Sequence, residues 1–511
     1  MNLIYGIKDR PSFDKIVLFA IQQLLAIMAA TIAVPAIVGN GLSASAALFG
    51  AGVGTIIYLL FTKSSSPVFL GSSFAFIGSM FSAFGGAASI SIGYWGLIIG
   101  ALMAGIVYII IAAIVKAFGV EWINKLMPPV IIGPTVAIIG LSLSGNAIGD
   151  LMKSSVEGGS TYVALICGLI TLGVTMLCST YGKKIGRLIP FIIGILAGYL
   201  AASIFAAIGK ATGNSSLIVI NYDALTSLDF HTAAAYVSLP KFAFFLGGLE
   251  GFKGITGTYL LTIFAAYVPV AFVVFAEHLA DHKNLSAIVG TDLLKEPGLT
   301  RTLLGDGVGT FVSTLFGGCP NTTYGESIGC VAITRNASTV SIWGCAILCI
   351  IFSLLTPLVA FLTTIPNCVM GGVCVALYGF IAVSGLKMFQ TVDLNKNKNL
   401  FVASVILITG VGGMVIKFGA VEIRTVACAL ILGILTNVML PKRKASLMSS
   451  WPRLFIKNVI VHYRISLLVN ETYTEITHTR TVDNGTCKDV TSLLESHSLG
   501  NTVIHYHTAV T

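Results

Sequence analysis

Charged residues are scarce in this chain of 511 residues. Lys, Arg, Asp and Glu together make up 10% of it, whereas hydrophobic residues make up 55%, and the mean hydropathy is +0.91. This composition excludes a water-soluble globular fold and is typical of a polytopic membrane protein. The net charge of +9 does not indicate a nucleic-acid partner, because the basic residues are dispersed among short loops and form no continuous basic stretch.

Several kinds of functional motif are missing as well. The ten cysteines show neither the spacing of a zinc site nor a disulfide framework, and most lie in apolar runs, where cysteine behaves as a small hydrophobic residue. The sequence has no evident nucleophile–base pair, metal-ligand cluster or phosphate-binding loop, so we expect no enzyme activity and no cofactor. The N-terminal stretch 1–15 lacks the order of a secretory signal, which predicts that the first apolar segment is retained as a membrane span.

Apolar runs of the length that crosses a bilayer, about 20 residues, recur along most of the chain. We predict an all-α polytopic membrane protein with fourteen spans, of which the third and tenth are short and irregular. The predicted spans are 16–35, 45–62, 70–84, 94–115, 128–148, 161–179, 188–208, 260–280, 303–317, 325–334, 340–362, 367–386, 399–416 and 422–440. Most basic loop residues then fall on the side of the N-terminus, so the positive-inside rule predicts that both termini are cytoplasmic.

An internal repeat relates the two halves of the chain. Residues 48–55 (LFGAGVGT) and 303–310 (LLGDGVGT) are identical at six of eight positions, and each copy leads to a glycine and polar turn, at Gly71 and at Gly325. The spacing from Pro128 to Gly133 also recurs from Pro366 to Gly371. Seven spans per half is an odd number, which predicts a 7+7 inverted repeat with a binding site near the midplane. A single copy would equally fit a small-residue packing face between helices.

Two stretches interrupt the helical pattern. Residues 67–76, with a glycine and polar turn at 71–73, and the polar residues 319–324 are prone to extended structure. Such backbone is tolerated at membrane depth only where it lines a cavity or is buried in protein. We predict short strands in spans 3 and 10 that aim two half-helix N-termini at one point, where a small polar ligand could dock. The alternative is that 321–323 is an ordinary loop. Glu326 lies two residues after the second stretch. It is an ionisable residue in an apolar setting, which indicates a binding site.

A second group of polar residues lies at 275–282 (FAEHLADH), at the end of a long run without charged residues. Glu277 and Asp281 are four residues apart and share one helix face. They mark either a solvated helix end at the cytoplasmic interface or, if the helix is shifted along its axis, a site near the midplane. His278 and His282 have the i, i+4 spacing of metal ligands, but no further ligands for a zinc site are evident, so no metal site is predicted.

Three of these stretches carry a family resemblance: 69–76 (FLGSSFAF), 275–278 (FAEH) and 320–335, which begins PNTTYGESIG and ends AITR. The chain resembles the nucleobase-ascorbate transporter (nucleobase-cation symport) family, and closely its bacterial uracil permease branch, over residues 5–440. The resemblance implies a core domain (1–120 and 257–364) and a gate domain (121–256 and 365–440) that move relative to each other like an elevator. Residues 441–511 form a polar C-terminal tail without a counterpart in the family.

The resemblance also implies a function and a set of site residues. It implies a symporter in a bacterial cell membrane that imports uracil with protons, and a homodimer formed through the gate domains. Glu277 and Glu326 would hold the pyrimidine, backbone groups of Phe74 and Gly325 would complete its hydrogen bonds, and Tyr324 would pack beside its ring. Glu277, Asp281 and Glu326 are the candidates for proton coupling. Uracil is flat and neutral, with N–H groups for carboxylates and carbonyls for backbone amides, which fits this set.

Two positions depart from the family pattern. Asp281 lies where related uracil carriers can have a histidine and purine carriers often have an aspartate, so xanthine, uric acid or another nucleobase stays an alternative substrate. Gln22 and Gln23 stand where the family usually reads Gln-His. An alternative from another class is an anion carrier or channel that binds its substrate at helix N-termini, although two acids at the site would repel an anion.

Overall fold

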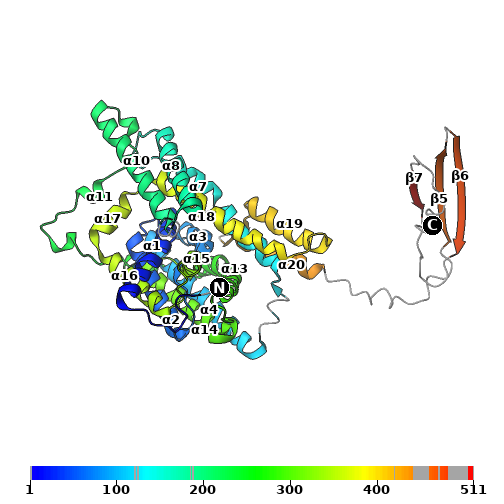
Figure 1. Cartoon of the computed structure of the whole chain (residues 1–511), viewed down its shortest axis with the longest axis horizontal. Helices are drawn as coiled ribbons and strands as arrows, with labels where there is room; N and C mark the ends of the chain where they lie inside the picture. Colours follow the sequence, from blue (N-terminus) through cyan, green and yellow to red (C-terminus); the bar gives the residue numbers. More distant parts are fainter. Residues whose placement is uncertain are drawn as a thin grey trace. The chain divides into compact units, whose positions relative to one another are not determined.

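The computed structural model describes residues 3–119, 122, 126–183, 186, 189–418 and 421–440, together with three strands between 460 and 509 (Figure 1). The chain divides into two compact units, Met1–Leu440 and Pro441–Thr511. The first unit contains the predicted spans and all predicted site residues, and the second corresponds to the predicted tail.

The first unit is mainly helical. Its helices are α1 (Phe13–Val38), α2 (Ala44–Phe61), α3 (Ile77–Gly85), α4 (Ile90–Phe118), α6 (Pro129–Ser142), α7 (Ser144–Leu151), α8 (Thr161–Tyr181), α10 (Pro190–Thr212), α11 (Asp223–Thr226), α12 (Ala243–Lys253), α13 (Gly257–Val289), α14 (Leu299–Gly317), α15 (Gly325–Thr334), α16 (Thr339–Leu354), α17 (Thr356–Thr364), α18 (Asn367–Lys387), α19 (Asn397–Val411) and α20 (Thr425–Met439). Short helical turns are η1 (Phe74–Phe76), η2 (Ser215–Leu217), η3 (Ala233–Ala235), η4 (Leu294–Gly298) and η5 (Met388–Thr391), and its strands are β1 (Leu70–Ser72), β2 (Asn321–Thr323), β3 (Ile416–Phe418) and β4 (Val421–Ile423).

Within the described residues, eight helical stretches are long and apolar enough to cross a membrane, and four further apolar helices are shorter. The two remaining predicted spans are α14 and α15. Helix α15 has only ten residues, and α14 carries Arg301 and Asp306 among glycines and threonines. Each predicted span therefore coincides with helical structure, which makes this a mostly helical, polytopic membrane-type fold. That all fourteen cross the membrane stays a prediction.

The helices pack in two sets. Helices α2, α4, α13, α14 and α16 contact one another, and α6, α7, α8, α10, α18, α19 and α20 form the other set; α8 lies beside α10 and α19 beside α20 (Figure 1). The repeated motif forms the contact between α2 and α14. A Cβ atom built on Gly309 would lie 2.9 Å from the carbonyl oxygen of Gly54, and one on Gly54 would lie 3.0 Å from that of Gly309. The glycines of the two copies thus allow close backbone approach.

Strands β1 and β2 pair antiparallel, with Gly71 opposite Thr322. Equivalent threonines of the two repeat copies hold them: the Leu70 N–H donates to Thr55 Oγ1 at 2.9 Å, and the Thr310 hydroxyl donates to the Asn321 carbonyl at 2.7 Å. The predicted strands are confirmed, and the alternative of an ordinary loop at 321–323 is wrong.

The prediction from the sequence that Gly71 and Gly325 are equivalent positions of the two repeat copies is wrong. Gly71 is the middle residue of β1, whereas Gly325 is the first residue of α15. The glycine–polar pattern looks the same at both places because each lies next to a half-helix. The two glycines nevertheless occupy different structural positions.

The second unit contains a three-stranded antiparallel sheet in the order β6-β5-β7. Its strands are β5 (Ile460–Val469), β6 (Thr472–Thr481) and β7 (Ile504–Ala509). The prediction of an all-α chain therefore holds for the first unit, apart from the predicted strands β1 and β2 and the pair β3 and β4, and is wrong for the second.

Candidate functional site

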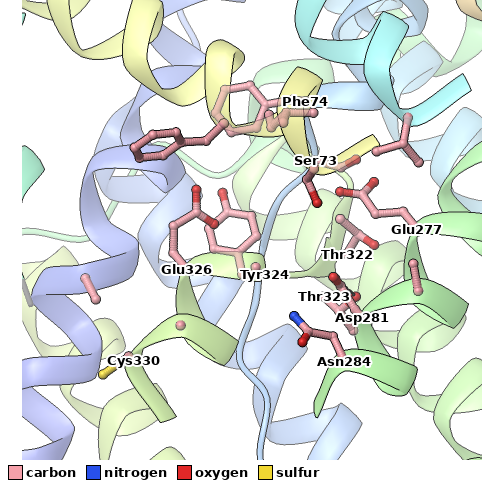
Figure 2. Close-up of a pocket in the computed structure, with 18 of the residues that line it drawn as sticks. Ser73, Phe74, Glu277, Asp281, Asn284, Thr322, Thr323, Tyr324, Glu326 and Cys330 are labelled. Atoms are coloured by element: carbon pink, nitrogen blue, oxygen red, sulfur yellow. Dashed lines mark hydrogen bonds between the residues drawn. The ribbon is translucent and has the colours of Figure 1, made fainter. Parts of the chain in front are cut away.

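A cavity of about 370 Å³ lies where the two half-helices begin (Figure 2). The six residues predicted from the sequence to form the site all line it: Phe74, Glu277, Asp281, Tyr324, Gly325 and Glu326. Its volume falls within the range of small-molecule sites, roughly 300–1,000 Å³. The fold therefore brings together the three separate stretches of sequence on which the prediction rested.

Two helix starts border the cavity. Phe74 begins η1, which leads into α3, and Gly325 begins α15. The first N–H groups of a helix have no partner within the helix and carry partial positive charge, so both starts offer donors to a ligand. The strand pair fixes their positions, because the Ser73 N–H donates to the Pro320 carbonyl at 2.8 Å and the Tyr324 N–H donates to the Phe69 carbonyl at 3.2 Å.

Tyr324 is locked in place between the strands. Its side chain is buried, with 3% of its surface exposed, and its hydroxyl donates to the Ser72 carbonyl at 2.8 Å. The ring covers Gly71, where an added Cβ would come within 2.2 Å of a ring carbon. Figure 2 shows the ring beside Glu326. Only glycine at position 71 allows this ring position.

Helix α13 contributes Glu277 and Asp281, one turn apart on the cavity side (Figure 2). The helix continues to Val289, about three turns beyond Glu277, so the reading of this group as a solvated helix end is wrong. The Thr323 hydroxyl donates to Asp281 Oδ2 at 2.7 Å. One face of α13 and one strand residue thus place two carboxyl groups opposite Glu326.

Two hydroxyl groups at the cavity were not predicted. Ser73 and Thr322 line it and are buried, with 1% and 2% of their surfaces exposed. Neither hydroxyl has a hydrogen-bond partner among the residues that the structure describes. Buried polar groups are almost always paired, so these hydroxyls are candidates for contact with a bound ligand. Their position at the helix interruptions is visible in the sequence. The sequence does not show, however, which side chains at these interruptions face the cavity.

A network of buried polar side chains joins α13, the helix that bears Glu277 and Asp281, to α14. His278 Nδ1 lies 2.7 Å from Asp306 Oδ2, and His278 Nε2 lies 3.0 Å from Thr302 Oγ1. The Thr310 hydroxyl lies 3.5 Å from Asp306 Oδ1, and the same hydroxyl holds β2. Asp306 was not singled out from the sequence. It could have been found, because it replaces Ala51 of the first repeat copy and places a carboxyl group in a helix of small residues.

The second histidine is also held by the protein. His282 Nδ1 donates to the His278 carbonyl at 2.8 Å, and its Nε2 lies 2.7 Å from the Tyr58 hydroxyl oxygen. The two imidazole rings stack with their centroids 4.1 Å apart. Both ring nitrogens of each histidine therefore face protein partners, and the i, i+4 spacing serves hydrogen bonding between helices.

The first helix reaches the same region through Gln23. Gln23 Nε2 donates to the Ser327 hydroxyl oxygen, which also accepts from the Phe69 N–H at 2.9 Å. Ser327 lies in the first turn of α15 and Phe69 directly precedes β1. The glutamine at the family's histidine position thus ties α1 to both interrupted segments.

The family assignment follows from comparison with known proteins. A model of the permease family matches residues 14–418. The chain belongs to this family. Similar bacterial relatives are the uracil permeases of Bacillus caldolyticus (39% identity, 86% of this chain and 95% of the relative), Bacillus subtilis (37%, 86% and 95%) and Escherichia coli K12 (37%, 84% and 92%). The resemblance to bacterial uracil permeases predicted from the sequence is confirmed.

Solved structures of low sequence identity share the fold of this permease. The transmembrane domain of the cyanobacterial bicarbonate transporter BicA aligns with a TM-score of 0.56 at 15% identity, over 85% of this chain and all of that domain. SLC26A9 aligns with a TM-score of 0.58 at 13% identity, over 90% of this chain and 68% of that protein. At these identities the likeness extends to the fold alone.

Proposed function

We propose that this permease is a symporter that imports uracil together with protons. The observation that carries the proposal is one cavity bordered by three carboxyl groups and two helix starts, in a chain 37–39% identical to proteins named uracil permease. Uracil presents N–H donors and carbonyl acceptors on one flat, neutral ring, and each has a complementary group around the cavity.

In this account Glu277 and Glu326 accept hydrogen bonds from the N–H groups of uracil. The free backbone N–H groups at the starts of η1 and α15, near Phe74 and Gly325, donate to its carbonyls. The ring of Tyr324 packs beside the pyrimidine, since aromatic faces suit flat, apolar ring surfaces. A site that hydrogen-bonds both edges rejects analogues that lack those groups, because its buried polar atoms would be left unpaired.

Proton coupling is proposed for Glu277, Asp281 and Glu326. Three carboxylates around one cavity repel one another, and a proton bound to one of them reduces that repulsion. Substrate and proton then favour each other's binding, and this coupling is reciprocal. The same negative charge argues against an anion as substrate, although the fold is shared with a bicarbonate transporter.

Transport is proposed to follow an elevator-like motion of a core domain (1–120 and 257–364) against a gate domain (121–256 and 365–440). The separate packing of two helix sets supports this division. The cavity lies between the sets, with Glu277 and Glu326 on one wall and Val136, Phe191 and Phe380 on the other. We further propose fourteen spans in a 7+7 inverted repeat, cytoplasmic termini in a bacterial cell membrane, and a homodimer formed through the gate domains.

Substrate choice is tested by uptake of labelled uracil into cells that lack their own carrier, in competition with xanthine, uric acid and thymine. Uptake that excess xanthine and uric acid leave unchanged supports a pyrimidine carrier. Absence of uracil uptake, or strong competition by xanthine, would instead indicate that Asp281 marks a purine-type site in the same fold.

A further inference from the structure

A second cavity, of about 220 Å³, shares one residue with the first. Phe74 lines both cavities. On α13, Val270 borders the second cavity and Glu277 the first; on α6, Ser142 borders the second and Val136 the first. Six or seven residues of helix correspond to about 10 Å. The cavities therefore follow one another along these helices, with Phe74 between them.

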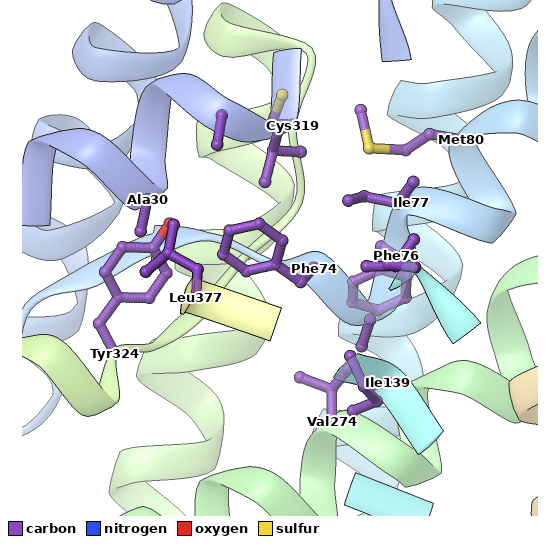
Figure 3. Close-up of a cluster of buried hydrophobic side chains, with 14 of the residues drawn as sticks. Ala30, Phe74, Phe76, Ile77, Met80, Ile139, Val274, Cys319, Tyr324 and Leu377 are labelled. Atoms are coloured by element: carbon purple, nitrogen blue, oxygen red, sulfur yellow. The ribbon is translucent and has the colours of Figure 1, made fainter. Parts of the chain in front are cut away.

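The Phe74 ring is part of a packed partition. It meets the Tyr378 ring edge-on, with 5.6 Å between centroids and an interplanar angle of 78°. Figure 3 shows Phe74 between Tyr324 on one side and Phe76 and Ile139 on the other. The partition is thin, because a single aromatic side chain contributes to the walls of both cavities.

The two cavities lie toward opposite ends of the helices. Asn284, toward the C-terminal end of α13, and Met388, directly after α18, line the first cavity. Nearby, the Ile4 and Tyr5 N–H groups donate to the carbonyl of Arg335, which follows α15, so this end carries the N-terminal segment. The second cavity is lined by Arg424, just before α20, on the side where the predicted topology places the cell exterior.

Arg424 joins the two helix sets at that end. Its Nε donates to Ser82 Oγ at 2.5 Å, and Ser82 lies in the last turn of α3. A guanidinium group is favoured at the C-terminal end of a helix by the helix dipole. The side-chain stem lies over Gly78, where an added Cβ would be 3.6 Å from Arg424 Cδ. Arg424 thus holds the far end of the half-helix whose beginning borders the first cavity.

From these contacts we infer that Arg424 is an outer latch for the transport cycle. Its hydrogen bond to Ser82 keeps α3 against the segment before α20, narrows the second cavity, and favours the conformation in which the site opens through the first. Movement of α3 away from α20 breaks this bond and opens the site toward the second cavity. The inference deepens the proposed transport function and rests on it.

Alkylation of one cysteine on each side of the partition tests the latch. Native Cys330 lines the first cavity, and a Ser142→Cys substitution places a reporter in the second. The rates of modification by a small maleimide are followed by peptide mass spectrometry on the purified full chain in lipid nanodiscs. Ser82→Ala and Arg424→Gln should each raise the rate at position 142 relative to Cys330 about fivefold, the effect of losing one hydrogen bond.

Ser79→Ala is the matched control. Ser79 also lies on α3 and lines the second cavity, but its hydroxyl donates to the Ala266 carbonyl of α13 at 2.6 Å, a bond within one helix set. The Ser79→Ala variant should leave the ratio of the modification rates at position 142 and at Cys330 unchanged. An unchanged ratio in both latch variants, or an equal change in Ser79→Ala, would overturn the inference. No substrate enters the assay, so a failed latch leaves the uracil proposal to its own test.

Discussion

His278 Nδ1 lies 2.7 Å from Asp306 Oδ2, and both side chains have no exposed surface. The contact joins α13 to α14 and fixes the helix that bears Glu277 and Asp281. Asp306 does not line the cavity, so it is a positioning residue in this account. Removing one partner of a buried hydrogen bond leaves the other polar group unsatisfied, which costs about 1–3 kcal/mol.

We therefore expect Asp306→Ala to lower the free energy of unfolding by about 1–3 kcal/mol. Thermal unfolding of the purified protein in detergent measures this as a lower midpoint temperature. Asp292→Ala is the comparison, because Asp292 is an exposed acid 3.6 Å from Lys295, and exposed pairs contribute about 0–1 kcal/mol. Equal midpoints for the two variants would mean that the buried pair does not hold the helices together.

Replacing either proposed substrate carboxylate should weaken uracil binding. A hydrogen bond to a charged group contributes about 2 kcal/mol, or about 30-fold in Kd, so Glu277→Gln and Glu326→Gln are each expected to raise Kd by about that factor. Isothermal titration with uracil measures it. Glu250→Gln, at an exposed acid on α12, should leave Kd unchanged. Unaltered affinity in both cavity variants would count against the proposed binding mode.

Gly71→Ala should displace the Tyr324 ring. The added methyl group would meet the ring at 2.2 Å, and overpacking of this kind costs about 1–3 kcal/mol. We expect lower thermal stability and weaker uracil binding together, because the ring borders the cavity. Gly85 lies at the end of α3, where an added Cβ would have no described atom within 4 Å. Gly85→Ala should therefore change neither the thermal stability nor uracil binding. Equal behaviour of the two variants would contradict the predicted clash.

The neighbouring residues Thr322 and Thr323 should have different roles. Thr323→Val removes the donor to Asp281, so it should alter the dependence of uptake on the proton gradient and change uracil Kd by less than about threefold. Thr322→Val removes a hydroxyl that has no partner in the described part of the chain and should raise Kd about fivefold, the effect of one neutral hydrogen bond. The same effects from both substitutions would refute this division of roles.

Local signals in the sequence marked the segments that line the cavity, and the family resemblance implied the individual residues. Polar residues interrupt apolar runs at 67–76 and 319–324, and Glu277 and Asp281 share a helix face by their spacing alone. The repeated motif also indicated that both interruptions belong to one arrangement. The structure shows why: Thr55 and Thr310, at equivalent positions of the two copies, each hold one strand.

Other features depend on contacts between distant residues, and no local pattern carries them. Gln23 and Ser327 are 304 residues apart, and the His278–Asp306 contact joins different helices. The correspondence drawn between Gly71 and Gly325 was wrong because a glycine–polar pattern occurs both within a strand and at a helix start. The three strands of the second unit were missed because that segment has the mixed composition of a tail.

Reconstituted vesicles offer the most direct test of coupled uracil and proton transport. The permease is placed in proteoliposomes that contain a pH-sensitive dye, and uracil is added outside without an imposed pH gradient. The account predicts that uracil acidifies the interior, that xanthine does not, and that Glu277→Gln abolishes the signal. Labelled uracil that equilibrates across the membrane with no change in internal pH would contradict it.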